Sequence, residues 1–246
     1  RPIVTKDFSW TASYNVAYNK NKITKLNNDG SYIETGGISS GNGNNCQVQA
    51  VGHPINSFYL FEQVYDKDGK PLEGVYVDQD NNGVINDDDR RIYHSKDPKV
   101  TMSFSSTFNW KNWDLGIAMH ANIGNYVYAD AMSDHAVVDD CWKNGKLNNL
   151  IQTDYYFNGT VNPAVGIMKS DYWLRNASFL RCDNITLGHT WPYLLDNKMR
   201  LRLYGAVQNP FVITKYKGLD PEVASGIDRD VYPRATTFTI GVVASF

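Results

Sequence analysis

Residues 8–18 alternate between aromatic or apolar side chains and small or polar ones, with a period of two. One row holds Phe8, Trp10, Ala12, Tyr14, Val16 and Tyr18, and the other holds Ser9, Thr11, Ser13, Asn15 and Ala17. Successive side chains of a β-strand point to opposite faces, so the pattern predicts a strand with one apolar and one polar face. Comparable patterns predict strands at about 7–26, 99–110, 113–127, 176–191, 198–210 and 235–246.

The predicted strands are long, and their connections differ greatly in length. Each strand can supply the roughly 9–11 residues that a membrane β-strand needs, whereas strands in soluble proteins average about 5–6. Short turns near Lys111 and Asp196 alternate with long connections, and residues 45–65 leave room for one more hairpin. The long connections lie at about 27–98, 128–175 and 211–234. Outer-membrane barrels combine short periplasmic turns with long extracellular loops. We therefore predict an all-β fold, a transmembrane antiparallel β-barrel.

The composition admits a second interpretation. Mean hydropathy is −0.45, yet aromatic residues make up 13% of the chain, with 16 Tyr and 6 Trp. A barrel with a polar lumen, an apolar exterior and aromatic girdles has this composition, and we expect Trp10, Trp110, Trp113 and Trp191 in the girdles. A soluble carbohydrate-binding β-sandwich has it too, and composition alone favours the sandwich.

Charge and motif content exclude several function classes. The net charge of −2 provides no basic surface for nucleic acid, and no apolar run approaches the roughly 18 residues of a membrane helix. We find no Ser/His/Asp constellation, phosphate-cradling loop or paired carboxylates on a rigid element, so we do not expect an enzyme. Cys46 and Cys141 lie in predicted loops, and the sequence leaves open whether they form a disulfide.

The first residues bear on processing of the protein, and the last residues bear on assembly of the predicted barrel. The sequence begins with Arg1 and has no basic-then-apolar leader, so we expect a mature form or a piece of a longer protein. The last strand carries an apolar residue at every second position: Phe238, Ile240, Val242, Ala244 and Phe246. A terminal Phe closing such a strand resembles the signal by which the outer-membrane assembly machinery recognises barrels. An ordinary edge strand is the alternative.

Residues 78–89 have the spacing of a calcium-binding loop. Gly83 stands at its sixth position, where the chain must turn sharply. The predicted ligands are Asp78, Asp80, Asn82, the backbone carbonyl of Val84, Asn86 and Asp89. Asp89 replaces the usual Glu and reaches less far, so we expect structural Ca²⁺ bound weakly, with Mg²⁺ tolerated. The alternative is an acidic turn without an ion.

Several segments, taken in order, resemble the SusC/RagA-type TonB-dependent outer-membrane transporters of Bacteroidetes. They are DFSWTASYNVAYNKNKITKL at 7–26, GHPINSFYLFEQ at 52–63, DQDNNGVINDDDR at 78–90, NWKNWDL at 109–115, YWLRNASFLRCDNITLGHTWP at 172–192, QNPFVITKYKGLDPEV at 208–223 and YPRATTFTIGVVASF at 232–246. Family members are several times longer. The resemblance implies that residues 1–246 are the C-terminal portion of a plugged barrel of about 22 strands, with the plug domain absent.

The resemblance also implies a function, the import of glycan or peptide across the outer membrane. The implied partners are a SusD-like surface lipoprotein, TonB acting through the absent N-terminal part, the rest of the barrel and plug, and membrane lipid. We expect aromatic side chains of the loop 128–175, chiefly Trp142 and Tyr156, to contact the substrate or the lipoprotein. A non-transport surface barrel shares the strands, and a plug and TonB box upstream of Arg1 would distinguish it.

Overall fold

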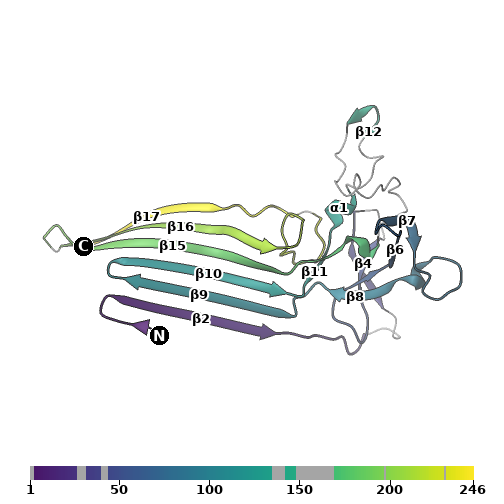
Figure 1. Cartoon of the computed structure of the whole chain (residues 1–246), viewed down its shortest axis with the longest axis horizontal. Coiled ribbons are helices and arrows are strands. Elements are labelled where there is room, and N and C mark those ends of the chain that lie inside the picture. The colour runs from purple at the N-terminus through teal and green to yellow at the C-terminus, as the bar shows by residue number, and fades with distance from the viewer. Residues whose placement is uncertain are drawn as a thin grey trace.

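The structure is a computed structural model, and it describes residues 3–26, 32–39, 44–134, 142–147, 169–196, 198–229 and 231–246. Its largest element is a long, curved antiparallel sheet of seven strands in the order β1-β2-β9-β10-β15-β16-β17 (Figure 1). The strands are β1 (Ile3–Val4), β2 (Phe8–Tyr18), β9 (Val100–Trp110), β10 (Trp113–Ile123), β15 (Phe179–Leu194), β16 (Met199–Thr214) and β17 (Thr237–Ser245). The edge strands β1 and β17 are not paired with each other, so the sheet is open in this chain.

The strand ends differ from the predicted ones for local reasons. β2 ends at Tyr18, not near residue 26, because its partner β9 begins at Val100. β10 ends at Ile123, not at residue 127, because Gly124 adopts a φ of +83° that turns the chain out of the sheet. β15 begins and ends three residues later than predicted, because residues 174–176 form a separate strand of the lobe and its pairing with β16 reaches Leu194. β16 continues four residues past its predicted end, to Thr214, because it stays paired with β15.

Cross-strand pairing gives the sheet one apolar and one polar face. A row of directly opposed residues on the apolar face crosses six strands: Trp10, Phe108, Leu115, Leu187, Gly205 and Ile240. The neighbouring row on the polar face holds Thr11, Thr107, Gly116, Thr186, Ala206 and Thr239. On the apolar face the rings of Trp10 and Phe108 stack 5.9 Å apart. The apolar face is exposed, and the Ile240 side chain retains 83% of its surface.

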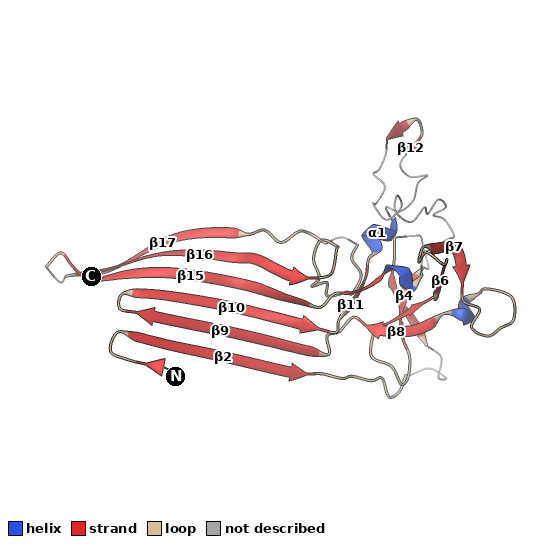
Figure 2. Cartoon of the chain, viewed as in Figure 1, coloured by secondary structure: helices blue, strands red, loops and turns tan. Residues whose placement is uncertain are grey.

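The long connections form a lobe at the end of the sheet remote from both termini (Figure 2). The lobe contains a four-stranded sheet in the order β3-β4-β5-β8 and three two-stranded pairs. The four strands are β3 (Ile33–Gly37), β4 (Asn45–Gln49), β5 (Ser57–Leu60) and β8 (Arg91–Ser95). The pairs are β6 (Gln63–Tyr65) with β7 (Pro71–Tyr76), β11 (Tyr126–Tyr128) with β14 (Leu174–Asn176), and β12 (Trp142–Lys143) with β13 (Lys146–Leu147). The long connections predicted at 27–98 and 128–175 thus contain strands of their own, among them the antiparallel pair β4–β5 within residues 45–65, where the sequence left room for a hairpin.

The compact hydrophobic core lies in this lobe and not under the long sheet. Its members come from all three long connections and include aromatic side chains. They are Ile38, Cys46, Phe58, Leu60, Tyr128, Tyr172, Trp173 and Ile227. Three short helical turns, α1 (Asp130–Asp134), η1 (Asp87–Asp89) and η3 (Asp171–Trp173), border it. No helix in the described part of the chain is long and apolar enough to cross a membrane.

Candidate functional site

The loop at residues 78–89 protrudes from the lobe between β7 and β8 and ends in η1 (Figure 2). Asp78, Asp80 and Asp89 each place one carboxylate oxygen within 4.8 Å of the others. Calcium binds oxygen at about 2.3–2.6 Å, so two oxygens on one ion lie at most about 5 Å apart. The three carboxylates are therefore close enough to share a single cation.

Backbone donors turn the carboxylates toward the inside of the loop. The Gly83 N–H donates to Asp78 Oδ2 at 2.8 Å, and the Asn82 N–H donates to Asp80 Oδ1 at 3.1 Å. Gly83 has a φ of +78° and Asn81 a φ of +60°, so both residues adopt the left-handed conformation of a tight turn. These two residues therefore produce the tight turn, which brings residues from opposite ends of the loop close to each other.

Asp89 anchors the loop to the lobe. Its side chain is buried, and its two oxygens accept the backbone N–H groups of Asn86 at 2.9 Å and Gln79 at 2.7 Å. The hydrogen bond from Asn86, followed by that from Gln79, lowers the pKa of Asp89 despite its burial. The carboxylate is therefore ionised at neutral pH.

The next residue, Arg90, ties the loop to three strands. Its guanidinium is buried and pairs with Glu34 on β3 at 2.9 Å. It also donates to the carbonyl oxygens of Asn45 at 2.7 Å and Tyr59 at 2.9 Å, and it lies 4.1 Å from the centre of the Tyr59 ring. A change at the loop can therefore act directly on the β3-β4-β5-β8 sheet.

The other predicted ligands occupy the same turn but are engaged locally. Asn82 Oδ1 accepts the Val84 N–H at 2.7 Å, and Asn82 Nδ2 donates to Asp80 Oδ2 at 2.8 Å. Asn86 Oδ1 accepts the Asp88 N–H at 2.7 Å and caps η1. The structure brings the three carboxylates together, while Asn82, Val84 and Asn86 stay predicted ligands.

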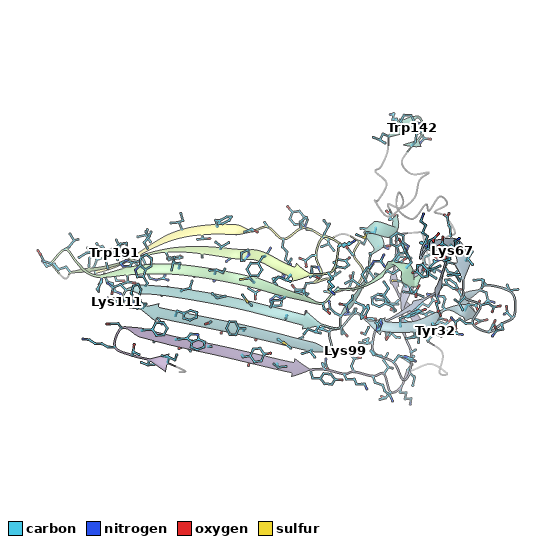
Figure 3. The ribbon with its side chains drawn as sticks, in the orientation of Figure 1. Tyr32, Lys67, Lys99, Lys111, Trp142 and Trp191 are labelled. Atoms are coloured by element: carbon cyan, nitrogen blue, oxygen red, sulfur yellow. The ribbon has the colours of Figure 1, made fainter. Side chains whose placement is uncertain are left out.

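Trp142, one of the two aromatic residues expected to contact substrate or lipoprotein, lies on the β12–β13 hairpin. Its side chain is 67% exposed, and Figure 3 places it at the tip of a projection from the lobe. Tyr156, the other, lies outside the described residues. By contrast, Tyr128, Tyr172 and Trp173 from the same connection are buried in the core of the lobe.

Ion pairs on the polar face were missed in the sequence, because their members are far apart along the chain. Near the lobe, Arg181 Nη2 lies 2.6 Å from Asp220 Oδ1, and Arg234 Nη2 lies 3.0 Å from Glu222 Oε2. Near the short turns, Arg202 Nη2 lies 2.6 Å from Asp114 Oδ2. The available signal was the presence of charged residues within the predicted strands, Asp114, Arg181 and Arg202 among them. The polar face thus carries fixed charges at both ends.

The cysteines and the terminal strand complete the predicted residues. Cys46 is a free, buried thiol whose pKa is raised chiefly by burial, while Cys141 lies outside the described residues. On β17, Phe238, Ile240 and Val242 are exposed on the apolar face, as is Phe246 beyond the strand.

No protein-family model matches the chain, but individual relatives do. It is 44% identical over 260 residues to the TonB-dependent receptor SusC of Bacteroides thetaiotaomicron, covering 100% of this chain and 25% of that protein. It is 28% identical over 287 residues to the TonB-dependent receptor P3 of Formosa agariphila, covering 100% of this chain and 28% of that protein. The chain therefore spans about a quarter of the length of these relatives.

Solved structures share the fold. The RagAB peptide transporter matches with a TM-score of 0.75 and 24% identity, over 99% of this chain and 28% of that one. The RagAB peptide importer in its open-open state matches with a TM-score of 0.73 and 26% identity, over 99% and 27%.

Proposed function

Because the chain belongs to the SusC/RagA-type TonB-dependent receptors, which are β-barrel proteins of the outer membrane and not enzymes, we propose that it forms part of the wall of a nutrient importer. The observation that carries this proposal is the two-faced sheet. Its strands reach 16 residues, and each apolar row is directly neighboured by a polar one. A barrel wall between lipid and a polar lumen needs this arrangement.

The soluble sandwich fits these features poorly. A sandwich buries one face of each sheet against another sheet, whereas Phe238 and Ile240 on the apolar face of β17 retain 77% and 83% of their surface. The core of the lobe lies at one end of the long sheet and leaves that face uncovered. An apolar sheet face that the rest of the protein leaves uncovered is favourable in contact with lipid and unfavourable in contact with water.

In this proposal the edges β1 and β17 pair with further strands of the same barrel, and a plug and TonB complete the machinery. The lobe faces the cell exterior, because short turns lie on the periplasmic side. A SusD-like lipoprotein then binds over the lobe, and the charged polar face lines the passage for glycan or peptide.

The proposal is tested by nutrient uptake in a strain lacking the full-length receptor and complemented with it. We expect growth on a glycan or a peptide source to require both the receptor and TonB. Loss of growth on glycans alone or on peptides alone identifies the substrate class. A receptor that assembles in the outer membrane, yet whose deletion alters growth on no source, overturns import and favours a non-transport surface barrel.

Trp142 is the described residue best placed for contact with the substrate or the lipoprotein. Its exposed ring can stack on a sugar or pack against a protein surface. Leu147 is its direct cross-strand partner, is equally exposed and lacks an aromatic ring. We expect Trp142→Ala to weaken uptake or lipoprotein binding and Leu147→Ala to leave both near the wild-type level. Equal effects of the two substitutions, or none, contradict a specific role for Trp142, and Tyr156→Ala tests the second residue.

We further propose that the 78–89 loop binds structural Ca²⁺ through Asp78, Asp80 and Asp89, with Asn82, the Val84 carbonyl and Asn86 as additional ligands. Support comes from the convergence of the three carboxylates and from the lowered pKa of Asp89, which keeps one of them charged. A bound cation would fix the position of Arg90 and, through it, three strands of the lobe. Binding at a concentration about 100-fold above the Kd stabilises the folded form by about 2.7 kcal/mol.

The test compares resistance of the lobe to proteolysis in the full-length receptor with Ca²⁺, with Mg²⁺ and with a chelator. We expect Ca²⁺ to protect the wild type most and Mg²⁺ less, and Asp80→Asn to abolish the protection. Asp68→Asn in the acidic turn at residues 66–69 is the matched control, because that turn lacks the ligand spacing. Equal cleavage with Ca²⁺ and with chelator in the wild type contradicts the proposal.

A further inference from the structure

The apolar face of the long sheet contains a groove near the short turns. The groove has a volume of about 410 Å³, within the range of about 300–1,000 Å³ that ligand pockets occupy. Its walls are almost entirely apolar and come from four strands. They are formed by Trp113, Leu187, His189, Trp191, Leu203 and Ile240, with Gly205 at the base.

Gly205 creates the groove. It is the one member without a side chain in the row that runs from Trp10 to Ile240, and it lies directly between Leu187 and Ile240. A Cβ at Gly205 would meet only the Thr239 carbonyl oxygen, at 4.0 Å. The backbone does not require glycine there, since Gly205 is not among the residues with positive φ. The missing side chain leaves an open space between Leu187 and Ile240.

The groove begins in the aromatic belt and points toward the middle of the membrane. His189 packs edge-on between Trp113 and Trp191, with ring centres 4.5 and 4.3 Å apart. Trp rings of barrels concentrate at the membrane–water interface. Leu187, Gly205 and Ile240 lie two residues farther from the turns than the row of Trp113, His189 and Leu203, toward the level of the hydrocarbon. An occupant must therefore be apolar along most of its length and end at the interface.

A cationic side chain lies at the same end of the sheet. Lys111, in the turn between β9 and β10, places its ammonium 5.5 Å from the centre of the exposed Trp110 ring. Lys111 and Trp191 lie at the same end of the sheet (Figure 3). A positive charge at the interface complements an anionic headgroup.

We infer that this groove holds one acyl chain of a phospholipid of the periplasmic leaflet, whose phosphate lies beside Lys111. The exposed apolar face, the aromatic belt and the adjoining cation match the three parts of such a lipid. This bound lipid differs from general lipid contact, because a groove around one chain retains it longer than a convex surface does. The inference requires the outer-membrane location and is independent of the transported substrate.

The experiment uses the full-length receptor in bilayers containing an anionic phospholipid with a photoactivatable group in its acyl chain. After irradiation, labelled residues are mapped by peptide mass spectrometry. We expect strong labelling within residues 187–191 and 201–205, several-fold above that of β2 and β9, whose residues do not line the groove. This comparison within the wild type does not depend on any variant folding.

Two variants then separate the groove from the surface around it. Gly205→Leu fills the space and should reduce labelling to the level of β2 and β9. Val207→Leu, the next position on the apolar face of β16, lies outside the groove and should leave labelling unchanged. Lys111→Gln should reduce labelling by the anionic lipid without abolishing labelling by a zwitterionic one.

Other results overturn the inference. Uniform labelling of the apolar face, or labelling unaffected by Gly205→Leu, shows ordinary lipid contact without a bound chain. An unlabelled groove together with cross-links through Trp191 between receptor copies assigns it to a second copy of this chain. An unchanged signal in Lys111→Gln removes the headgroup from the proposal.

Discussion

Arg181 and Asp220 form a buried ion pair in which Arg181 Nη2 lies 2.6 Å from Asp220 Oδ1. Arg181 projects from β15, and Asp220 belongs to the connection that follows β16. Asp220 also accepts Arg234 Nε at 2.9 Å and the Glu222 N–H at 2.8 Å. One carboxylate therefore fixes the last long connection to the polar face of the sheet.

Asp220→Ala should destabilise the protein more than loss of an exposed ion pair. Removing one partner of a buried pair costs about 3–5 kcal/mol when the other charge is left uncompensated. Glu222 Oε2 lies 3.4 Å from Arg181 Nε and compensates part of that charge, so we expect a cost toward the lower end of this range. Lys96→Gln, in the more exposed pair with Asp97, should cost less than about 1 kcal/mol. Urea unfolding of the full-length receptor in lipid, followed by the heat-dependent gel shift, measures both. Equal urea midpoints of unfolding for Asp220→Ala and Lys96→Gln contradict the prediction that the pair of Asp220 contributes more to stability than the exposed pair.

Gly188→Ala should separate the ion pair between Asp114 and Arg202. A Cβ at Gly188 would lie 2.6 Å from Arg202 Nη2 and 2.6 Å from Asp114 Oδ1, so one side chain must move. Overpacking of this kind costs about 1–3 kcal/mol. Gly116 lies on the same polar face with no atom within 4 Å of its ideal Cβ, and Gly116→Ala is the matched control. Unfolding curves that coincide for the two variants contradict this account.

The long sheet could be predicted from the sequence because the alternating polarity of each strand can be read within that strand alone. Membrane and lumen impose opposite polarity on alternate residues, so residues 8–18 or 237–245 carry the pattern without knowledge of their neighbours. Only the ends required structural information, as at Gly124, where a positive φ ends β10. The calcium-type spacing at residues 78–89 was visible for the same reason, since a metal loop is a local motif.

The lobe could not be predicted, because contacts between distant segments determine it. Arg90 binds Glu34, Asn45 and Tyr59, none of which lies near it in sequence. Strand β5, Ser57–Leu60, is buried on both faces, so its residues show no alternation of polarity. The ion pairs of Arg181 and Arg202 likewise join residues 39 and 88 positions apart.

Phe246→Ala should reduce the amount of assembled barrel without altering a barrel that has already formed. Phe246 is almost fully exposed beyond β17, so its removal costs little folding energy in the mature protein. If it contributes to the assembly signal with Phe238, Ile240, Val242 and Ala244, the outer-membrane level of the receptor should fall and degradation products should accumulate. Ser245→Ala is the control on the alternate face. Wild-type levels of the Phe246→Ala receptor contradict the predicted signal.

Asp228→Asn should stabilise the lobe near neutral pH. Asp228 is buried, and burial raises the pKa of its carboxyl, with the charges of Asp130 and Asp220 acting in the same direction. The Tyr216 hydroxyl donates to Asp228 Oδ2 at 2.5 Å and offsets part of this shift. Asparagine retains an acceptor for that hydroxyl and carries no charge.

The sign follows from proton binding. A carboxyl with a raised pKa binds more protons in the folded than in the unfolded state, so it favours folding below the unfolded pKa of about 3.9. That contribution is lost as pH rises through the folded pKa. Tryptophan-monitored urea unfolding should therefore give equal stability for wild type and Asp228→Asn near pH 3.5 and higher stability for the variant at pH 7. Asp66→Asn, in an exposed turn, should follow the wild type at both values. A constant difference between wild type and Asp228→Asn across this range contradicts the raised pKa of Asp228.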